Sequence, residues 1–136
     1  MLQGELFKPL TRDERQAQAI QAWKQAKGQA TIVAATGVGK TYMAIKIIAG
    51  LKKAKSNLHT IVLVPTTTLK EQWESELDFH GLGFNTEVYV MMGASKKHYD
   101  CDLLVIDEAH RVSSEVLSTN LVNTTYKFIL GLTATF

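Results

Sequence analysis

The sequence predicts an α/β fold, with a mostly parallel β-sheet and helices on both faces. Short runs of branched apolar residues, typical of strands buried on both faces of a parallel sheet, occur at 31–34, 60–64 and 102–106. Each run is followed by a segment whose apolar residues recur at helical spacing. Strands that alternate with helices in this way form an open parallel sheet through right-handed crossover connections.

Length and composition indicate one ordinary globular domain over residues 1–136. The chain is 46% hydrophobic and 21% charged, and its formal net charge of +2 is too small to indicate a nucleic-acid partner by itself. A single cysteine, Cys101, excludes an internal disulfide and a cysteine-cluster metal site. No stretch approaches the ~20 apolar residues of a membrane helix, and the first ten residues lack the features of a signal peptide. We therefore expect a cytoplasmic protein that has no membrane partner.

The first two helices flank the strand 31–34. Thr11 and Glu14 have the spacing of a capping box, and Gly28 is expected to end the helix that follows. Its apolar face is expected to contain Ala17, Ile20 and Trp23. The second helix begins near Lys40 and ends in the polar run 52–57, whose lysines suit a solvated helix end better than a nucleic-acid contact.

Three further strands and two helices complete the pattern. Pro65 ends the strand 60–64, and Thr68 with Glu71 predicts a second capping box for a helix that buries Leu69, Trp73 and Leu77. A turn at 81–83 leads to a strand at 86–91 and a polar connection at 93–100. The strand 102–106, a helix at 114–121 and a strand at 126–132 follow.

The loop after the first strand has the features of a phosphate-binding loop. Gly37 and Gly39 can adopt positive φ and let backbone N–H groups approach a phosphate. Lys40 can contact the outer phosphates, and the Thr41 hydroxyl can hold Mg²⁺. The helix that begins here presents its N-terminus to the anion. The general pattern has glycine where this chain has Ala34, so the generic motif matches with one difference.

Polar residues also follow the other strands. Pro65 and Thr66 come after strand 60–64, Asp107 and Glu108 after strand 102–106, and Thr133 after strand 126–132. Because ligands of parallel α/β sheets bind beyond the carboxyl ends of the strands, we expect these residues at one edge. The first acid could hold Mg²⁺ through water, and the second could orient or deprotonate the water that attacks a γ-phosphate. Taken singly, the acids could cap a helix and residues 133–135 could form a plain turn.

Four motifs in this order resemble the first RecA-like lobe of superfamily-two DEAD/DEAH-type helicases, especially the branch that contains restriction-enzyme, repair and phage helicases. Residues 36–41 resemble its ATP loop, 62–66 its next motif, 107–110 its DEAH box and 131–135 its third motif. The resemblance covers nearly the whole chain. It implies a RecA-like P-loop NTPase domain that uses ATP and Mg²⁺ and acts on nucleic acid, with DNA favoured over RNA.

The resemblance also implies a role for each motif residue. Lys40 would bind the β- and γ-phosphates, Asp107 and Thr41 would hold the metal, and Glu108 would act on the attacking water. Contacts to the nucleotide are expected from Gln16, Thr36, Gly37, Val38, Gly39, Lys40 and Thr41. Coupling to nucleic acid is expected from Pro65, Thr66, His110, Thr133 and Thr135. A surface glutamine on the outer side of its helix would explain Gln16 nearly as well.

Two functional interpretations remain open. The sequence ends at Phe136, directly after the third motif, so we expect another chain to supply the family's second RecA-like lobe. Arginines from that lobe can contribute ~10³–10⁵ in rate, and the lobe alone should hydrolyse ATP poorly. The first interpretation is an ATP-binding lobe of a helicase or translocase; the second is a nucleotide- or nucleic-acid-binding module without productive turnover. A P-loop kinase would need an acceptor-binding lid, for which no segment is available.

One family motif has no clear copy. The stretch between Thr66 and Asp107 is shorter than in most relatives, and residues 86–96, with Ser95 and Lys96, could be a reduced form of the motif that grips the nucleic-acid backbone.

Overall fold

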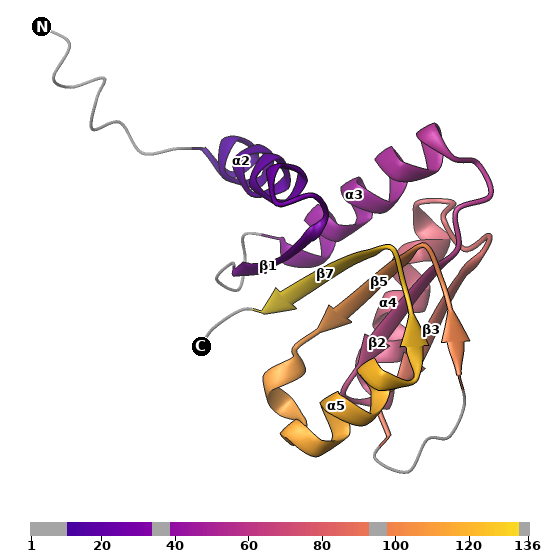
Figure 1. Ribbon diagram of the computed structural model, residues 1–136. Helices are drawn as coiled ribbons and strands as arrows, with labels where there is room; N and C mark the ends of the chain where they lie inside the picture. The colour runs from indigo at the N-terminus through magenta and orange to yellow at the C-terminus, as the bar shows by residue number, and fades with distance from the viewer. Residues whose placement is uncertain (1–10, 34–38, 93–97, 134–136) are drawn as a thin grey trace, which may run out of the picture.

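The computed structural model describes residues 11–33, 39–92 and 98–133 and has the expected α/β architecture (Figure 1). Five strands form one sheet in the order β1-β7-β5-β2-β3, and every neighbouring pair is parallel. These strands are β1 (Gln29–Val33), β2 (Thr60–Val64), β3 (Thr86–Val90), β5 (Leu103–Asp107) and β7 (Phe128–Thr133). A second, two-stranded parallel sheet joins β4 (Tyr99–Asp100) to β6 (Thr124–Thr125).

Helices cover both faces of the sheet, as predicted. They are α2 (Arg12–Gln25), α3 (Lys40–Ala54), α4 (Thr67–Phe79) and α5 (Ser114–Val122), with the short 3₁₀ helix η1 (Ala109–Arg111) after β5. Helices α2, α3 and α4 pack over one face, and α5 packs over the other. Residues of β5 alternate between the two cores, with Leu103 and Val105 on the first face and Leu104 and Ile106 on the second.

The N-terminus of α4 differs from the prediction. Thr66 is the N-cap, and its hydroxyl accepts a hydrogen bond from the Leu69 backbone N–H at 3.2 Å. The predicted cap at Thr68 is wrong because Thr68 lies inside the helix, whereas Thr66 has the extended backbone (φ −138°, ψ 156°) that a capping residue needs. The predicted cap at Thr11 is confirmed by a 3.1 Å hydrogen bond from the Glu14 N–H.

The buried side of α2 is rotated from the predicted one. Gln16 is 2% exposed and Trp23 is 3% exposed, and Ala19 and Ile20 pack against the same core. Ala17 is exposed instead. The glutamine can occupy the interior because its amide oxygen accepts a hydrogen bond from Lys46 of α3.

Three small elements were not predicted. The expected connection 93–100 contains β4, the expected strand 126–132 is preceded by β6, and η1 follows β5. The strand β7 begins at Phe128 rather than residue 126 because the Lys127 and Phe128 N–H groups both donate to the Asp102 carbonyl, at 3.2 and 2.9 Å.

Close packing between β1 and β7 requires glycine at position 131. A β-carbon there would lie 2.5 Å from Thr31 Oγ1.

We expect Gly131→Ala to lower the free energy of unfolding by about 1–3 kcal/mol. Adding Thr31→Ala to that variant should restore most of the lost stability. Gly50→Ala is the control, because among the described residues no atom outside the adjoining helix backbone lies within 4 Å of the added carbon. That change in α3 should raise stability by about 0.5–1 kcal/mol in urea unfolding. Equal effects of the two substitutions would contradict this packing.

Asp102 links the start of β5 to its surroundings. Its carboxylate accepts hydrogen bonds from the His59 backbone N–H at 2.9 Å and from Lys55 Nζ at 3.0 Å. The His59 hydrogen bond, followed by the Lys55 contact, lowers the pKa of Asp102 below its ordinary value. The stabilisation is therefore present above the unfolded-state pKa of ~3.9 and is lost as the pH falls through the lower folded-state pKa.

We expect Asp102→Asn to lower the urea midpoint at pH 7, with the difference from the parent shrinking as the pH falls below about 4. Unfolding curves at several pH values measure this difference. The exposed Asp78, changed to asparagine, is the control. A difference for Asp102→Asn that stays constant down to the lowest pH would contradict the assignment.

Candidate active site

The carboxyl ends of neighbouring strands bring the predicted polar residues to one edge of the sheet. Lys40 begins α3, Asp107 is the last residue of β5, and Thr133 is the last residue of β7. Pro65 and Thr66 connect β2 to α4 at the same edge. The predicted residues Thr36, Gly37, Val38 and Thr135 lie outside the described residues, as do Ser95 and Lys96.

One lysine contacts two carboxylates. Lys40 Nζ forms a short ion pair with Asp107 Oδ1 and lies 3.2 Å from Glu108 Oε1. Asp107 is 1% exposed, and Glu108 is 9% exposed. A buried carboxylate without a cationic partner is costly, so the lysine compensates both acids. Lys40, predicted to bind phosphate, therefore contacts both predicted acids. Asp107 is the one predicted to hold the metal, and Glu108 is the one predicted to act on the attacking water.

Trp73, which is predicted to line the inner face of its helix, also belongs to this cluster. The Trp73 indole N–H donates to Asp107 Oδ2 at 2.9 Å. Trp73 is itself 1% exposed and lies on α4. A buried indole N–H usually finds an acceptor, which was the available signal, but helical spacing alone does not say which acceptor.

Glu108 is held by an unusual backbone conformation. Its backbone has φ 54° and ψ 44°, in the left-handed region that residues other than glycine rarely adopt. Its N–H donates to the Leu132 carbonyl of β7 at 2.9 Å, and its Oε2 lies 3.3 Å from His110 Nε2. Left-handed backbone costs roughly 1–2 kcal/mol at such a residue. Strain of this kind is concentrated at functional sites.

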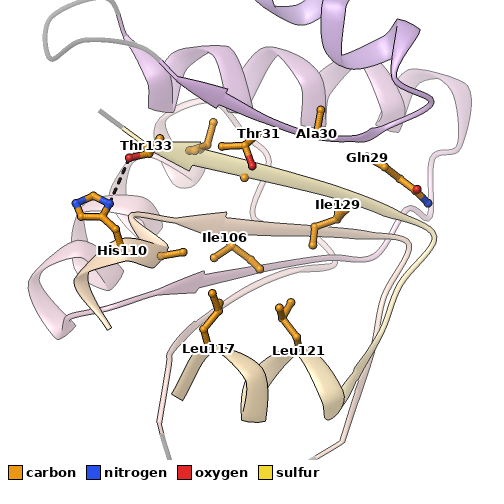
Figure 2. Close-up of a pocket in the computed structure, with 12 residues that line it drawn as sticks. Gln29, Ala30, Thr31, Ile106, His110, Leu117, Leu121, Ile129 and Thr133 are labelled. Atoms are coloured by element: carbon orange, nitrogen blue, oxygen red, sulfur yellow. Dashed lines mark hydrogen bonds between the residues drawn. The ribbon is translucent and has the colours of Figure 1, made fainter. Parts of the chain in front are cut away.

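His110 connects the acids to the end of β7. Its Nδ1 lies 3.3 Å from Thr133 Oγ1, a hydrogen bond drawn as a dashed line in Figure 2. Its other ring nitrogen is the one that faces Glu108. Two of the residues predicted to couple the site to nucleic acid, His110 and Thr133, are therefore in direct contact, and His110 also contacts the predicted water-activating acid Glu108.

The N-terminus of α3 is suited to an anion. The hydroxyls of Thr11, Thr66 and Ser113 cap α2, α4 and α5, but within the described parts of the chain no side chain caps α3. Its N-cap is Gly39, with φ 76°, a conformation that favours glycine. Uncapped N–H groups and the helix dipole together form a binding site for a phosphate group.

A cavity of about 460 Å³ opens beside the ion pair, between the start of α3 and the inner side of α4. It is lined by Gly39, Lys40, Thr41, Tyr42, Leu69, Gln72, Trp73, Glu76 and Asp107. Thr41 and Asp107 supply a hydroxyl and a carboxylate oxygen, the ligand types that Mg²⁺ takes when substrate phosphates and water complete its shell. In the ranges 11–33, 39–92 and 98–133 no three His, Cys, Asp or Glu residues form a metal-binding group. These residues fit magnesium that arrives with a nucleotide.

Gln16 occupies a buried position between two helices. Its Oε1 accepts a hydrogen bond from Lys46 Nζ at 3.5 Å, and Lys46 Nζ also lies 4.7 Å from the centre of the Tyr42 ring. The alternative of a surface glutamine is wrong, because the residue is 2% exposed. Its expected contact with the nucleotide stays a prediction.

A second cavity, of about 410 Å³, lies on the other face of the sheet. Figure 2 shows Leu117 and Leu121 of α5 pointing toward Ile106 and Ile129 of the sheet, with His110 and Thr133 at one end. The wall is predominantly apolar, and neither Lys40 nor Asp107 lines it. The Lys40–Asp107 ion pair therefore lines the first cavity and not this one.

Two other features bear on function. Burial raises the pKa of Cys101 to about 12, so the thiol stays protonated near neutral pH and is a poor nucleophile. None of the helices in the described part of the chain is long and apolar enough to cross a membrane.

A comparison with protein-family models identifies the family of this chain. The family model described as "Type III restriction enzyme, res subunit" matches residues 10–102 and 85–136. The chain belongs to this family. The matched residues include Lys40, Asp107 and Glu108 at the carboxyl edge of the sheet.

Two curated relatives support this assignment. The DNA 3'-5' translocase XPB2 of Sulfurisphaera tokodaii is 32% identical over 149 aligned positions, which cover 93% of this chain and 32% of the relative. The putative helicase 109L of Invertebrate iridescent virus 3 is 29% identical over 129 positions, which cover 74% of this chain and 37% of the relative. The chain thus spans about a third of the length of these relatives.

Solved structures show the same fold. The Sulfolobus solfataricus SWI2/SNF2 ATPase core in complex with dsDNA matches 92% of this chain and 31% of its own, with a TM-score of 0.72 and 18% identity. A nuclease-deletion mutant of the type ISP restriction-modification enzyme LlaGI, in complex with a DNA substrate mimic, matches 94% of this chain and 18% of its own, with a TM-score of 0.60 and 18% identity. The described sheet and helices therefore have the RecA-like α/β fold of these proteins.

Proposed function

We propose that this chain is the ATP-binding lobe of a DNA-dependent ATPase of the helicase or translocase type. The observation that carries the proposal is the contact of Lys40 with both Asp107 and Glu108, beside an α3 N-terminus without a side-chain cap. A cation, two acids and the backbone N–H groups of a helix N-terminus are the parts required to hold and hydrolyse a nucleoside triphosphate.

Binding of the nucleotide would redistribute the charges of this cluster. Lys40 would turn from the acids to the β- and γ-phosphate oxygens, while the first N–H groups of α3 donate to the same phosphates. Asp107 and Thr41 would then hold magnesium, Asp107 through water. A bound Mg²⁺ would neutralise the negative charge that develops on the phosphoryl group during transfer.

Glu108 would orient the attacking water and accept its proton at a carboxylate oxygen, as the water oxygen bonds to the γ-phosphorus and the bond between that phosphorus and the leaving ADP oxygen breaks. His110 lies 3.3 Å from Glu108 Oε2 and supports that carboxylate on the side opposite Lys40. Thr133, in contact with His110, would communicate the state of the site to β7. Thr66, Pro65 and Thr135 would contribute to the nucleic-acid surface.

DNA is the favoured nucleic acid. One relative is described as a DNA translocase, and two proteins with similar folds were solved with DNA or a DNA mimic. We propose further that a second RecA-like lobe completes the ATP site in trans with an arginine, which can raise the rate by ~10³–10⁵. The lobe alone would then bind MgATP and hydrolyse it slowly.

Steady-state ATPase activity of the purified chain tests the proposal, measured alone and with single- or double-stranded DNA or RNA. Turnover that DNA raises more than RNA does would support it. Stimulation by RNA alone would contradict the choice of DNA. MgATP binding without turnover under every condition would favour the alternative of a nucleotide-binding module. Absence of both binding and turnover would reject the nucleotide site.

Removing the Lys40 charge should weaken MgATP binding by roughly 10–100-fold, because hydrogen bonds to charged groups contribute about 1.5–3 kcal/mol. Isothermal titration of Lys40→Ala with a non-hydrolysable ATP analogue measures the change. The exposed Lys53→Ala, in the same helix, is the control for loss of one positive charge. Parental affinity in Lys40→Ala would show that the phosphates bind elsewhere.

Glu108→Gln keeps the shape of the side chain and removes its ability to take a proton. We expect unchanged or tighter MgATP binding and turnover reduced by about 10²–10⁴-fold. The assay is phosphate release, with the exposed Glu71→Gln of α4 as the matched control. Undiminished turnover in Glu108→Gln would remove this residue from the catalytic role.

A further inference from the structure

We infer that Trp73 is a positioning residue for the metal-holding carboxylate of Asp107. This inference rests on the proposed function and adds a residue on α4 to the magnesium site. Its basis is one hydrogen bond between two side chains that are each 1% exposed, from Trp73 Nε1 to Asp107 Oδ2 at 2.9 Å.

The hydrogen bond assigns each Asp107 oxygen to a different partner. Oδ2 accepts from the neutral indole, and Oδ1 faces the charged Lys40. An Asp side chain can rotate about its last torsion, and a lysine beside it would attract both oxygens. The indole keeps Oδ2 away from Lys40, so the lysine holds the carboxylate through one oxygen. That arrangement limits the lysine–aspartate attraction, which magnesium and phosphate must overcome.

Packing fixes the indole in place. Trp73 belongs to the core formed by α2, α3 and α4 on one face of the sheet. Its helix begins directly after β2, where Thr66 caps it, and β2 is the neighbour of β5 in the sheet. Both Trp73 and Asp107 also line the cavity beside α3. A donor on a rigid helix therefore faces an acceptor at the end of a rigid strand.

Residues that hydrogen-bond a metal ligand commonly change metal affinity or activity 10–100-fold when they are replaced. Trp73→Phe retains the aromatic ring and removes the N–H. In this variant we expect the Mg²⁺ concentration that half-saturates magnesium-dependent ADP binding to rise about 10-fold. Binding of ADP in EDTA, which does not use Asp107 as a metal holder, should be unchanged. A purely structural role for Trp73 would weaken both kinds of binding together.

The chain contains a matched control. Its other tryptophan, Trp23, is also buried, and its indole N–H donates to the Ile129 carbonyl at 3.0 Å. Ile129 is the second residue of β7, far along the strand from the end at Thr133. Trp23→Phe therefore removes the same atoms from a similar buried setting and should leave the magnesium requirement at the parental value.

Trp23→Phe also provides a second measurement that does not require the Trp73 variant to fold. Trp73 is then the chain's single tryptophan, and its fluorescence reports on the indole beside Asp107. We expect emission to change saturably with MgADP, at the Mg²⁺ concentration that binding requires, and to change less with ADP in EDTA.

The outcomes separate the inference from the proposed function. If the parent binds no MgADP, the proposed function fails and the inference fails with it. If the parent binds MgADP but folded Trp73→Phe has the parental magnesium requirement, the inference alone is overturned. Emission of Trp73 that MgADP leaves unchanged, in a variant that binds MgADP, would overturn it as well.

Discussion

The ion pair between Lys40 and Asp107 is the interaction on which the rest of the site depends. It joins the start of α3 to the end of β5, two residues 67 positions apart in the sequence. Asp107 is 1% exposed, and a buried carboxylate left without a cation would destabilise the protein by about 3–5 kcal/mol. The lysine that a phosphate would attract is thus also the lysine that keeps the acids in the fold. In the proposed function, magnesium that arrives with the nucleotide would replace that charge.

The four oxygens of the two acids face three partners, which come from different parts of the chain. The lysine of α3 contacts one oxygen of each acid, the indole of α4 holds the other oxygen of Asp107, and His110 of η1 faces the other oxygen of Glu108. From His110 a further hydrogen bond reaches Thr133 of β7. In the proposed function, a change at the phosphates of a bound nucleotide would therefore have a direct physical connection to β7, through Glu108, His110 and Thr133.

Local sequence pattern was sufficient to predict the structure where neighbouring residues determine it. Apolar runs and helical spacing located the main strands and helices, and polar residues after parallel strands predicted their meeting at one edge. Local pattern was not sufficient where a residue far away in the sequence determines a contact. The hydrogen bond of Trp73 depends on an acceptor 34 residues away, which spacing within α4 cannot reveal. Thr66 and Thr68 are both plausible caps by composition, and only the backbone conformation selects the first.

Backbone amide chemical shifts, measured as MgADP is added to ¹⁵N-labelled protein, test most directly that the edge beside Lys40 is the nucleotide site. The account predicts saturable shifts that are largest at Lys40, Thr41 and Glu108, with Leu117 and Leu121 of α5 little affected. Shifts centred on α5 and the cavity beneath it, or an unchanged spectrum at millimolar MgADP, would contradict it.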